Sequence, residues 1–298
     1  MRIGNVTKHS HIERDAATEM LMTTSPNGVV LVTGASSGLG QAMARHFRQR
    51  GLRVYGTSRQ PRGSHDVAWP MLQLDVRSDA SVQACVDDVR GAEGRIDVLI
   101  NNAGYAFVGA VEETSVADTR DQMETNFFGV MRMMKAVLPV MRDQGAGRIV
   151  NISSLAGIVG APFLGAYAAS KHALEGISEA LAHELRGTRI HVTLVEPDGM
   201  RTGIGFHHPD SDSPLLATRR RRMLAMLQQA TAEQGGGTDP DLLAHAVADS
   251  LESDRPPLRI VIGEAAQALI TAWRTLPDAA FGDLLAARLE ADPGATRT

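Results

Sequence analysis

The sequence has a single cysteine, Cys85, no apolar run long enough to span a membrane, and no excess of basic residues. One cysteine excludes an internal disulfide framework and a metal site built from cysteines. Because no stretch of about 18 apolar residues occurs, we expect no transmembrane helix. The formal net charge of -4 argues against nucleic acid as the main partner. These absences leave a cytoplasmic enzyme as the leading class.

The composition is that of a folded chain. Of the 298 residues, 43% are hydrophobic and 21% are charged, which is enough apolar material for a substantial core. Residues 1–27 are polar and lack the apolar block of a secretory signal. We therefore expect a polar N-terminal extension over residues 1–27, ahead of the folded part.

From residue 28 onward, strand and helix patterns alternate. Short apolar runs predict strands at 29–32, 54–55, 71–74, 96–100, 148–152, 190–195 and 258–262. Helical spacing separates them, including one long helix around residues 120–142. Continuous apolar strands joined by helices predict a parallel sheet covered on both faces. The expected fold class is α/β, a doubly wound parallel sheet of about seven strands in one domain.

In the last third of the chain, the alternation of strand and helix patterns becomes irregular. We expect a substrate lid over residues 203–237, within a domain that spans 28–263. The arginine run 219–222 in this lid is expected to form the solvated face of a helix. Residues 264–298 are expected to be a C-terminal helical extension, with helices near 264–276 and 279–289.

A glycine-rich turn follows the first predicted strand. The sequence TGASSGLG occupies positions 33–40, directly before a helical pattern. Glycines permit a sharp turn and let the backbone approach a pyrophosphate, while the helix N-terminus supplies N–H groups and positive potential. Three glycines alone form a weak motif, but their place between a strand and a helix predicts a dinucleotide phosphate site.

A second motif places a phenol beside an ammonium group. Tyr167 and Lys171, in the sequence YAASK, are four residues apart and share one face of a predicted helix. A nearby cation favours phenolate, so we expect the pKa of Tyr167 to be lowered. A tyrosine with a lowered pKa can act as the acid in a reduction and as the base in an oxidation.

These motifs resemble those of the short-chain dehydrogenases/reductases. TGASSGLG is similar to their TGxxxGxG signature, NNAG at 101–104 matches their motif after the fourth strand, and YAASK matches YxxxK. The likeness covers roughly residues 29–202 and implies a Rossmann fold. It also implies a catalytic tetrad of Asn126, Ser154, Tyr167 and Lys171, with Ser154 and Tyr167 binding the substrate oxygen and Asn126 supporting a proton relay.

The resemblance also assigns the cofactor site. It implies contacts from Gly34, Ser36, Ser37, Gly38, Leu39, Gly40, Ser58, Arg59, Asp75, Val76, Asn102, Ala103, Gly104, Tyr167, Lys171, Pro197 and Thr202. The second strand ends in Ser58, where an acidic residue would favour NAD. A hydroxyl and the guanidinium of Arg59 can bind a 2′-phosphate, so we predict NADP(H) rather than NAD(H).

One position departs from the family pattern. Relatives commonly read Pro-Gly after the sixth strand, whereas this chain has Asp198 after Pro197. Because an aspartate stands where relatives have glycine, the backbone path at Asp198 is expected to differ from theirs, unless Gly199 takes the place of that glycine. Thr202 keeps the spacing from Pro197 that the family shows.

The sequence defines the type of reaction more closely than it defines the substrate. The long tail resembles hydroxysteroid and retinol dehydrogenase-like members, which implies a hydrophobic ketone or secondary alcohol. The alternatives are a reductase of a small polar or acyl-carrier-linked ketone, and a non-catalytic NADP-binding regulator. No metal motif is present. The resemblance further implies a homodimer or homotetramer.

Overall fold

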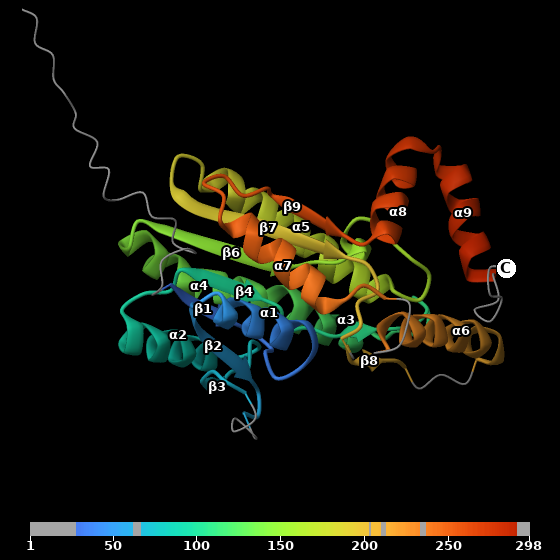
Figure 1. Ribbon diagram of the computed structural model, residues 1–298. Helices are drawn as coiled ribbons and strands as arrows, with labels where there is room; N and C mark the ends of the chain where they lie inside the picture. Colours follow the sequence, from blue (N-terminus) through green and yellow to red (C-terminus); the bar gives the residue numbers. More distant parts are fainter. Residues whose placement is uncertain (1–27, 62–66, 203, 210–212, 233–236, 291–298) are drawn as a thin grey trace, which may run out of the picture.

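The computed structural model describes residues 28–61, 67–202, 204–209, 213–232 and 237–290 (Figure 1). The N-terminal extension expected over residues 1–27 lies outside these ranges, as do parts of the predicted lid.

Seven parallel strands form the central sheet, as predicted. They are β1 (Val29–Val32), β2 (Arg53–Ser58), β3 (Met71–Gln73), β4 (Val98–Asn101), β6 (Ala146–Ile152), β7 (Arg189–Pro197) and β9 (Arg259–Ile262). Their order is β3-β2-β1-β4-β6-β7-β9. The chain runs outward from β1 to β3 and then crosses to β4, so the direction of winding switches between β1 and β4. In such sheets, ligands bind at the carboxyl ends of the strands beside this switch point.

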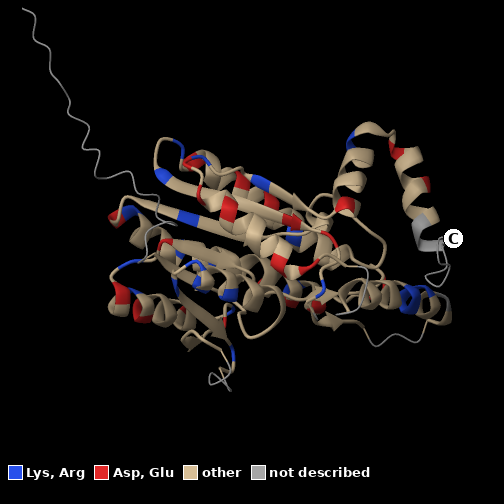
Figure 2. Cartoon of the chain, viewed as in Figure 1, with Lys and Arg blue, Asp and Glu red and all other residues tan. Residues whose placement is uncertain are grey.

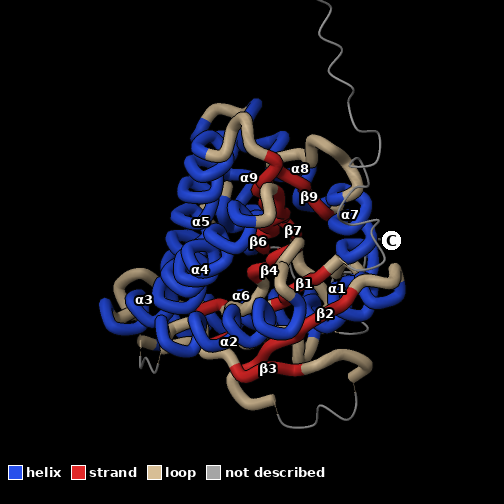
Figure 3. Tube along the Cα trace, turned by 90° about the vertical axis from the view of Figure 1, so that its left-hand side faces the viewer, coloured by secondary structure: helices blue, strands red, loops and turns tan. Residues whose placement is uncertain are grey.

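Helices cover both faces of the sheet (Figure 3). One face packs on α2 (Asp79–Glu93), α4 (Gly129–Asp143) and α5 (Gly165–Glu184), and the other on α1 (Gly38–Gln49) and α7 (Pro240–Leu251). The inner strands β1 and β4 are completely buried on both sides, which is why they read as apolar runs. The doubly wound α/β class is confirmed.

A polar network crosses the core between β4, β6 and α5. The Asn101 Nδ2 donates to Asn151 Oδ1 at 2.8 Å, and the Asn151 Nδ2 donates to Ser178 Oγ at 2.8 Å. All three residues are buried. Since buried amides must be hydrogen-bonded, this network ties the end of β4 to the neighbouring strand and helix.

The single long helix expected around 120–142 is wrong in detail. The structure has α3 (Val116–Met123), a π-helix over Glu124–Phe128, and then α4. In a π-helix the backbone hydrogen bonds span five residues instead of the four of an α-helix, so the turn accommodates one extra residue, and such turns are frequent at functional sites. The apolar pattern does not reveal the extra residue, because α3 and α4 each keep their own helical period.

The outer elements gather at the end of the sheet where β7 and β9 finish (Figure 1). The short strands β5 (Ala106–Phe107) and β8 (Phe206–His207) pair in parallel, and α6 (Pro214–Thr231) follows. The helices α8 (Glu264–Thr275) and α9 (Asp278–Glu290) form a hairpin that projects beyond the sheet. Within the described part of the chain, no helix has the length and apolarity that a membrane span requires.

The arginine run lies on α6, as Figure 2 shows. Arg219, Arg221 and Arg222 are exposed, as expected. Arg220 is an exception, because its side chain is buried and pairs with the buried Glu113 at 2.7 Å. The expectation of a fully solvated run is therefore wrong at Arg220. Its ion pair with Glu113 connects α6 to the segment after β5.

Candidate active site

The turn from β1 into α1 has the geometry that its glycines predict. Gly34 and Gly38 adopt φ of 67° and 55°, a left-handed conformation that favours glycine. A Cβ at Gly40 would overlap the carbonyl oxygen of Gly34. Substitution at any of the three positions would thus strain or fill a turn that is built from bare backbone.

The N-terminus of α1 points its N–H groups into this turn. Ser37 is the N-cap in an extended conformation, but its side chain makes no capping hydrogen bond, and the first turn contains no acidic residue. The helix therefore offers backbone donors and positive potential to an anion. Ser36, Ser37, Leu39 and the three glycines fit the pyrophosphate of a dinucleotide.

The end of β4 is tied to the same turn through Thr33. The Thr33 hydroxyl accepts hydrogen bonds from the backbone N–H groups of Asn102 (2.9 Å) and Ala103 (3.0 Å). The Asn102 side chain in turn donates to the carbonyl oxygens of Thr33 and Gly34, at 2.9 and 3.1 Å. Thr33 positions the cofactor loop, although the predicted site omits it. Its place as the first residue of TGASSGLG is the signal that points to it.

The segment after β7 reaches the glycine turn from the other side. A Cβ at Gly38 would overlap the carbonyl oxygen of Thr202. Pro197 ends β7 opposite Ile262 of β9. The structure therefore brings Thr202 to the glycine turn, while Pro197 lies at the carboxyl end of β7, despite Asp198 between them.

The ends of β2 and β3 carry the residues predicted to face the adenosine. The Ser58 hydroxyl is buried and has no hydrogen-bond partner among the described residues, while Arg59 beside it is exposed. Asp75 accepts a hydrogen bond from the Arg77 backbone N–H at 3.0 Å, which fixes the carboxylate. Val76 is buried against Gly129. An unpartnered hydroxyl next to a free guanidinium fits a phosphate on the adenosine ribose.

Tyr167, Lys171 and Ser154 lie together where β6 meets α5. The Lys171 Nζ is 5.8 Å from the centroid of the Tyr167 ring and donates a hydrogen bond to the Ile152 carbonyl oxygen at 2.7 Å. Ser154 follows β6 and hydrogen-bonds to the Tyr167 hydroxyl. The Ser154 Oγ also accepts from the Ala156 N–H at 3.1 Å. This arrangement places two hydroxyls and an ammonium group around one point.

The protonation of this cluster differs from the expectation. Burial raises the pKa of Tyr167, and the hydrogen bond from Ser154 only partly offsets it. Burial also lowers the pKa of Lys171 to about 8, although Glu175 opposes the change. Lys171 was expected to lower the pKa of the phenol, but loss of solvation sets the direction of the shift instead.

Asn126 lies in the π-helix and faces the same site. Its Oδ1 accepts from the Tyr105 N–H at 3.2 Å, and its Nδ2 donates to the Tyr105 carbonyl oxygen at 3.0 Å and to Ser170 Oγ at 3.3 Å. A Cβ at Gly104 would lie 3.0 Å from Asn126 Oδ1. Of the four predicted tetrad members, Tyr167 and Lys171 are thus on α5, Ser154 follows β6, and Asn126 in the π-helix contacts the segment after β4.

An acidic cluster behind Lys171 was not predicted. Arg259 on β9 pairs with Glu175 at 3.2 Å, with Glu196 at 3.2 Å and with Glu179 at 3.0 Å. Glu175 and Glu196 are buried, and burial together with the charge of Glu175 raises the pKa of Glu196 to about 7. These residues come from α5, β7 and β9, so no local sequence motif could reveal the cluster.

Apolar side chains pack around Tyr167. Val108, Leu164 and Met223 form a buried cluster that packs with Phe163, Tyr167, Phe206, Leu224 and Leu227. Phe163 adopts a φ of 63°, which is unusual for a bulky residue. Among the described residues, no group of three or more histidine, cysteine or acidic side chains has an arrangement that could hold a metal ion.

Comparison with known proteins agrees with this geometry. The short chain dehydrogenase family matches residues 28–210. The chain belongs to the short-chain dehydrogenases/reductases, a family of oxidoreductases.

Two curated relatives and one solved structure are similar over most of their length. A 3-ketodihydrosphingosine reductase from Bacteroides thetaiotaomicron is 40% identical over 84% of this chain and 93% of its own. Retinol dehydrogenase 8 from Homo sapiens is 35% identical over 80% of this chain and 82% of its own. A short-chain dehydrogenase structure from Streptomyces avermitilis has a TM-score of 0.78 at 33% identity, covering 89% of this chain and 99% of its own.

Proposed function

We propose that this protein is an NADP(H)-dependent oxidoreductase that interconverts a hydrophobic ketone and its secondary alcohol. The observation that carries the proposal is the grouping of Ser154, Tyr167 and Lys171 at the carboxyl edge of the sheet. The glycine turn with a bare helix N-terminus lies at the same edge.

The cofactor-binding residues are assigned from their positions. The turn over 33–40 holds the pyrophosphate, and Asn102, Ala103 and Gly104 line the adenosine side. Ser58 and Arg59 favour a 2′-phosphate, because the unpartnered hydroxyl and the exposed guanidinium are both donors. When bound, NADPH supplies the hydride for the carbonyl carbon.

The chemistry follows from the three side chains around the substrate oxygen. Tyr167 holds its proton at neutral pH because burial raises its pKa, so it is the acid that protonates the oxygen in reduction. Ser154 donates a second hydrogen bond to that oxygen. Lys171 binds the nicotinamide ribose, and Asn126 supports the path by which the tyrosine regains its proton.

A hydrophobic substrate is supported by two independent observations. The cluster around Tyr167 is apolar and draws on α6, within the segment we assign as a lid. The relatives named as a 3-ketodihydrosphingosine reductase and a retinol dehydrogenase carry lipid names. A long-chain or polyene carbonyl compound matches both observations better than a small polar ketone or an acyl-carrier-linked one.

We also propose a cytoplasmic homodimer or homotetramer that associates through α4 and α5. Phe128, the last residue of the π-helix directly before α4, is 42% exposed, which is high for a phenylalanine. Sedimentation of the wild-type chain and of Phe128→Lys tests this association, and a monomeric wild-type protein would contradict it.

The central experiment compares Tyr167→Phe with the wild type. We expect reduction of an apolar ketone to fall by about 10²–10⁴-fold, because the acid is lost, while NADPH binding by fluorescence is retained. Tyr55→Phe is the matched control, since that phenol bonds to Glu93 away from the site. Undiminished turnover in Tyr167→Phe would refute the assignment. A preference for small sugars in a carbonyl panel would instead overturn the substrate class.

A further inference from the structure

Asp198 is the residue that departs from the family pattern, and its carboxylate is fully engaged. Its backbone N–H donates to the Ile262 carbonyl oxygen at 3.1 Å, which continues the pairing of β7 with β9. The Thr238 hydroxyl donates to Asp198 Oδ1 at 2.7 Å. Asp198 thus connects the end of β7 with the segment between α6 and α7.

The other side of the carboxylate lies on the N-terminus of α8. The N-cap of this helix is Gly263, with φ of 105° and no side chain to cap the free N–H groups. A Cβ at Gly263 would overlap the Asp198 carboxylate, and the backbone of Ala266 hydrogen-bonds to it. Ala266 is the third residue of the helix, the position that an N-cap side chain normally serves. Asp198 therefore caps α8 from a distant part of the chain.

The base of the lid closes at the same point. The Thr238 N–H donates to the Gly199 carbonyl oxygen at 2.8 Å, and the Arg201 N–H donates to the Thr238 carbonyl oxygen at 3.1 Å. A Cβ at Gly199 would lie 2.8 Å from the Cβ of Ala230 in α6. The two ends of the segment 199–238 are thus held together beside Asp198.

The two elements joined at Asp198 pack on two different apolar clusters near the catalytic hydroxyls. From α6, Met223, Leu224 and Leu227 pack in the cluster that includes Tyr167. From the hairpin, Leu269 and Phe281 pack on Val159, with Leu155 and Ile158 at the edge of that cluster. Leu155 directly follows Ser154 in the sequence, and Ile158 is four positions after Ser154. The lid and the hairpin therefore form two apolar walls, one beside each catalytic hydroxyl.

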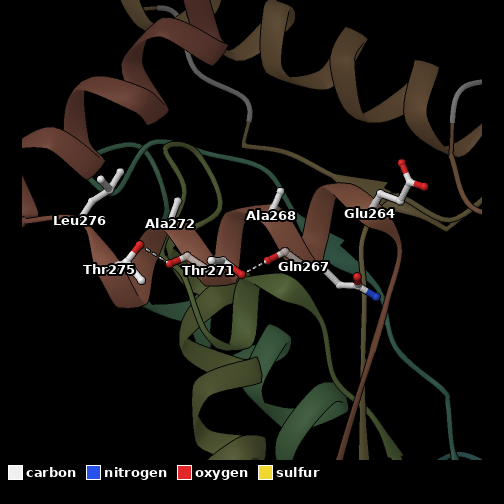
Figure 4. Close-up of a pocket in the computed structure, with 7 residues that line it drawn as sticks. All are labelled: Glu264, Gln267, Ala268, Thr271, Ala272, Thr275 and Leu276. Atoms are coloured by element: carbon white, nitrogen blue, oxygen red, sulfur yellow. Dashed lines mark hydrogen bonds between the residues drawn. The ribbon is translucent and has the colours of Figure 1, made fainter.

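The outer face of α8 lines an open groove of about 610 Å³ (Figure 4). The Thr271 and Thr275 hydroxyls donate to the carbonyl oxygens of Gln267 and Thr271 within the helix, each at 2.8 Å. These hydroxyls are satisfied by the helix itself, so the rest of the lining is apolar at Ala268, Ala272 and Leu276 and polar at Glu264 and Gln267. The placement of α8 sets the shape of this groove as well as the packing on the Ser154 segment.

We propose that Asp198 is a positioning residue for substrate selection, which fixes the α6 lid and the α8–α9 hairpin relative to each other. This inference rests on the proposed reduction of a hydrophobic ketone. A long substrate needs both walls in place, whereas a small ketone needs only the catalytic hydroxyls and the cofactor. Loss of the carboxylate should therefore affect the two kinds of substrate differently.

The test compares Asp198→Ala and Asp198→Asn with the wild type. For a long-chain ketone such as 3-ketodihydrosphingosine, we expect Asp198→Ala to raise KM about tenfold, because one cap and one lid contact are lost. For a small cyclic ketone we expect kcat, KM and the NADPH dissociation constant to stay within about twofold. Asp198→Asn should recover much of the loss, since its oxygen can still cap α8 and its amide can donate to Thr238. Asp283→Ala, on the exposed face of α9, is the matched control.

Hydrogen exchange gives a readout that needs no substrate. In Asp198→Ala, amides in the first turn of α8 and around residue 238 should exchange faster, while those of α7 should not change. If both substrates lose activity equally, or if NADPH binding weakens, Asp198 belongs to the cofactor loop and the proposal is wrong. If no ketone is reduced by the wild type, the proposed function fails, whereas unchanged exchange in α8 refutes the role of Asp198 alone.

Discussion

Gly38 and Thr202 are in backbone contact, although 164 positions separate 38 from 202 in the sequence. A side chain of any size at Gly38 would overlap the Thr202 carbonyl oxygen, and Gly38 has a φ of 55°. The contact joins the first turn of α1 to the segment after β7. The predicted phosphate site therefore depends on two segments that must close on each other.

Gly38→Ala should weaken NADPH binding by at least about tenfold, because the new methyl group forces Thr202 away from the turn and strains the backbone. Isothermal titration of NADPH measures the change. Gly91→Ala is the control, since a Cβ there meets nothing within 4 Å inside α2. Equal affinities in the two variants would show that the turn does not hold the phosphates.

Arg59→Asp should shift the cofactor preference. The exposed guanidinium is placed to pair with a 2′-phosphate, so its replacement by a carboxylate should raise the KM for NADPH by at least about tenfold and leave that for NADH nearly unchanged. Steady-state kinetics with both cofactors provide the measurement. Arg48→Asp, on the exposed face at the end of α1, serves as the control. Retained NADPH affinity in Arg59→Asp would contradict the NADP assignment.

Glu196→Gln should change how stability depends on pH. The pKa of Glu196 is raised from 4.5 to about 7 in the folded protein, so the folded state binds more protons than the unfolded chain between these values. Its stabilising contribution is therefore complete below the unfolded pKa and is lost as the pH rises through the folded one, an effect of about 2–3 kcal/mol. Urea unfolding from about pH 5 to about pH 8 should show this decline in the wild type and a flatter profile in Glu196→Gln.

The control for this experiment is Glu179→Gln. Glu179 also pairs with Arg259, but 48% of its side chain is exposed, so solvent screens it. Its pH profile should follow that of the wild type. Parallel profiles for wild type and Glu196→Gln would show that the buried cluster does not titrate in this range.

Asn151→Ala should lower the free energy of unfolding by about 2–4 kcal/mol, because it leaves Asn101 and Ser178 without their buried partner. Chemical denaturation monitored by circular dichroism measures this loss. Ser178→Ala removes one end of the same network and should cost about 1–2 kcal/mol. A smaller loss for Asn151→Ala than for Ser178→Ala would contradict the network as described.

Local sequence was sufficient for the parts of the fold whose cause is local. The inner strands β1 and β4 are apolar runs because both of their faces are buried. The glycine turn is visible because its φ values require glycine at positions 34 and 38. Tyr167 and Lys171 were also predictable as neighbours, since four residues on a helix bring side chains to one face.

Other features depend on contacts between distant segments and could not be predicted. The burial of Arg220 requires Glu113, and the cap on α8 requires Asp198 from β7. Lys171 alone predicts a lowered pKa for Tyr167. In the structure the pKa is raised, because the fold as a whole buries the phenol. The sequence pattern marks Asp198 only as a departure, without showing what it contacts.

The π-helix between α3 and α4 makes the site sensitive to the number of residues before it. Gln122 on α3 binds the Phe107 N–H at 2.7 Å, and Asn126 within the π-helix binds Tyr105. Removing one residue from 124–128 would restore a continuous α-helix and rotate α3 by about 100° relative to α4. Gln122 would then face away from β5. A single-codon deletion there would therefore separate Gln122 from Phe107 or Asn126 from Tyr105, contacts that now hold both side chains on the same segment.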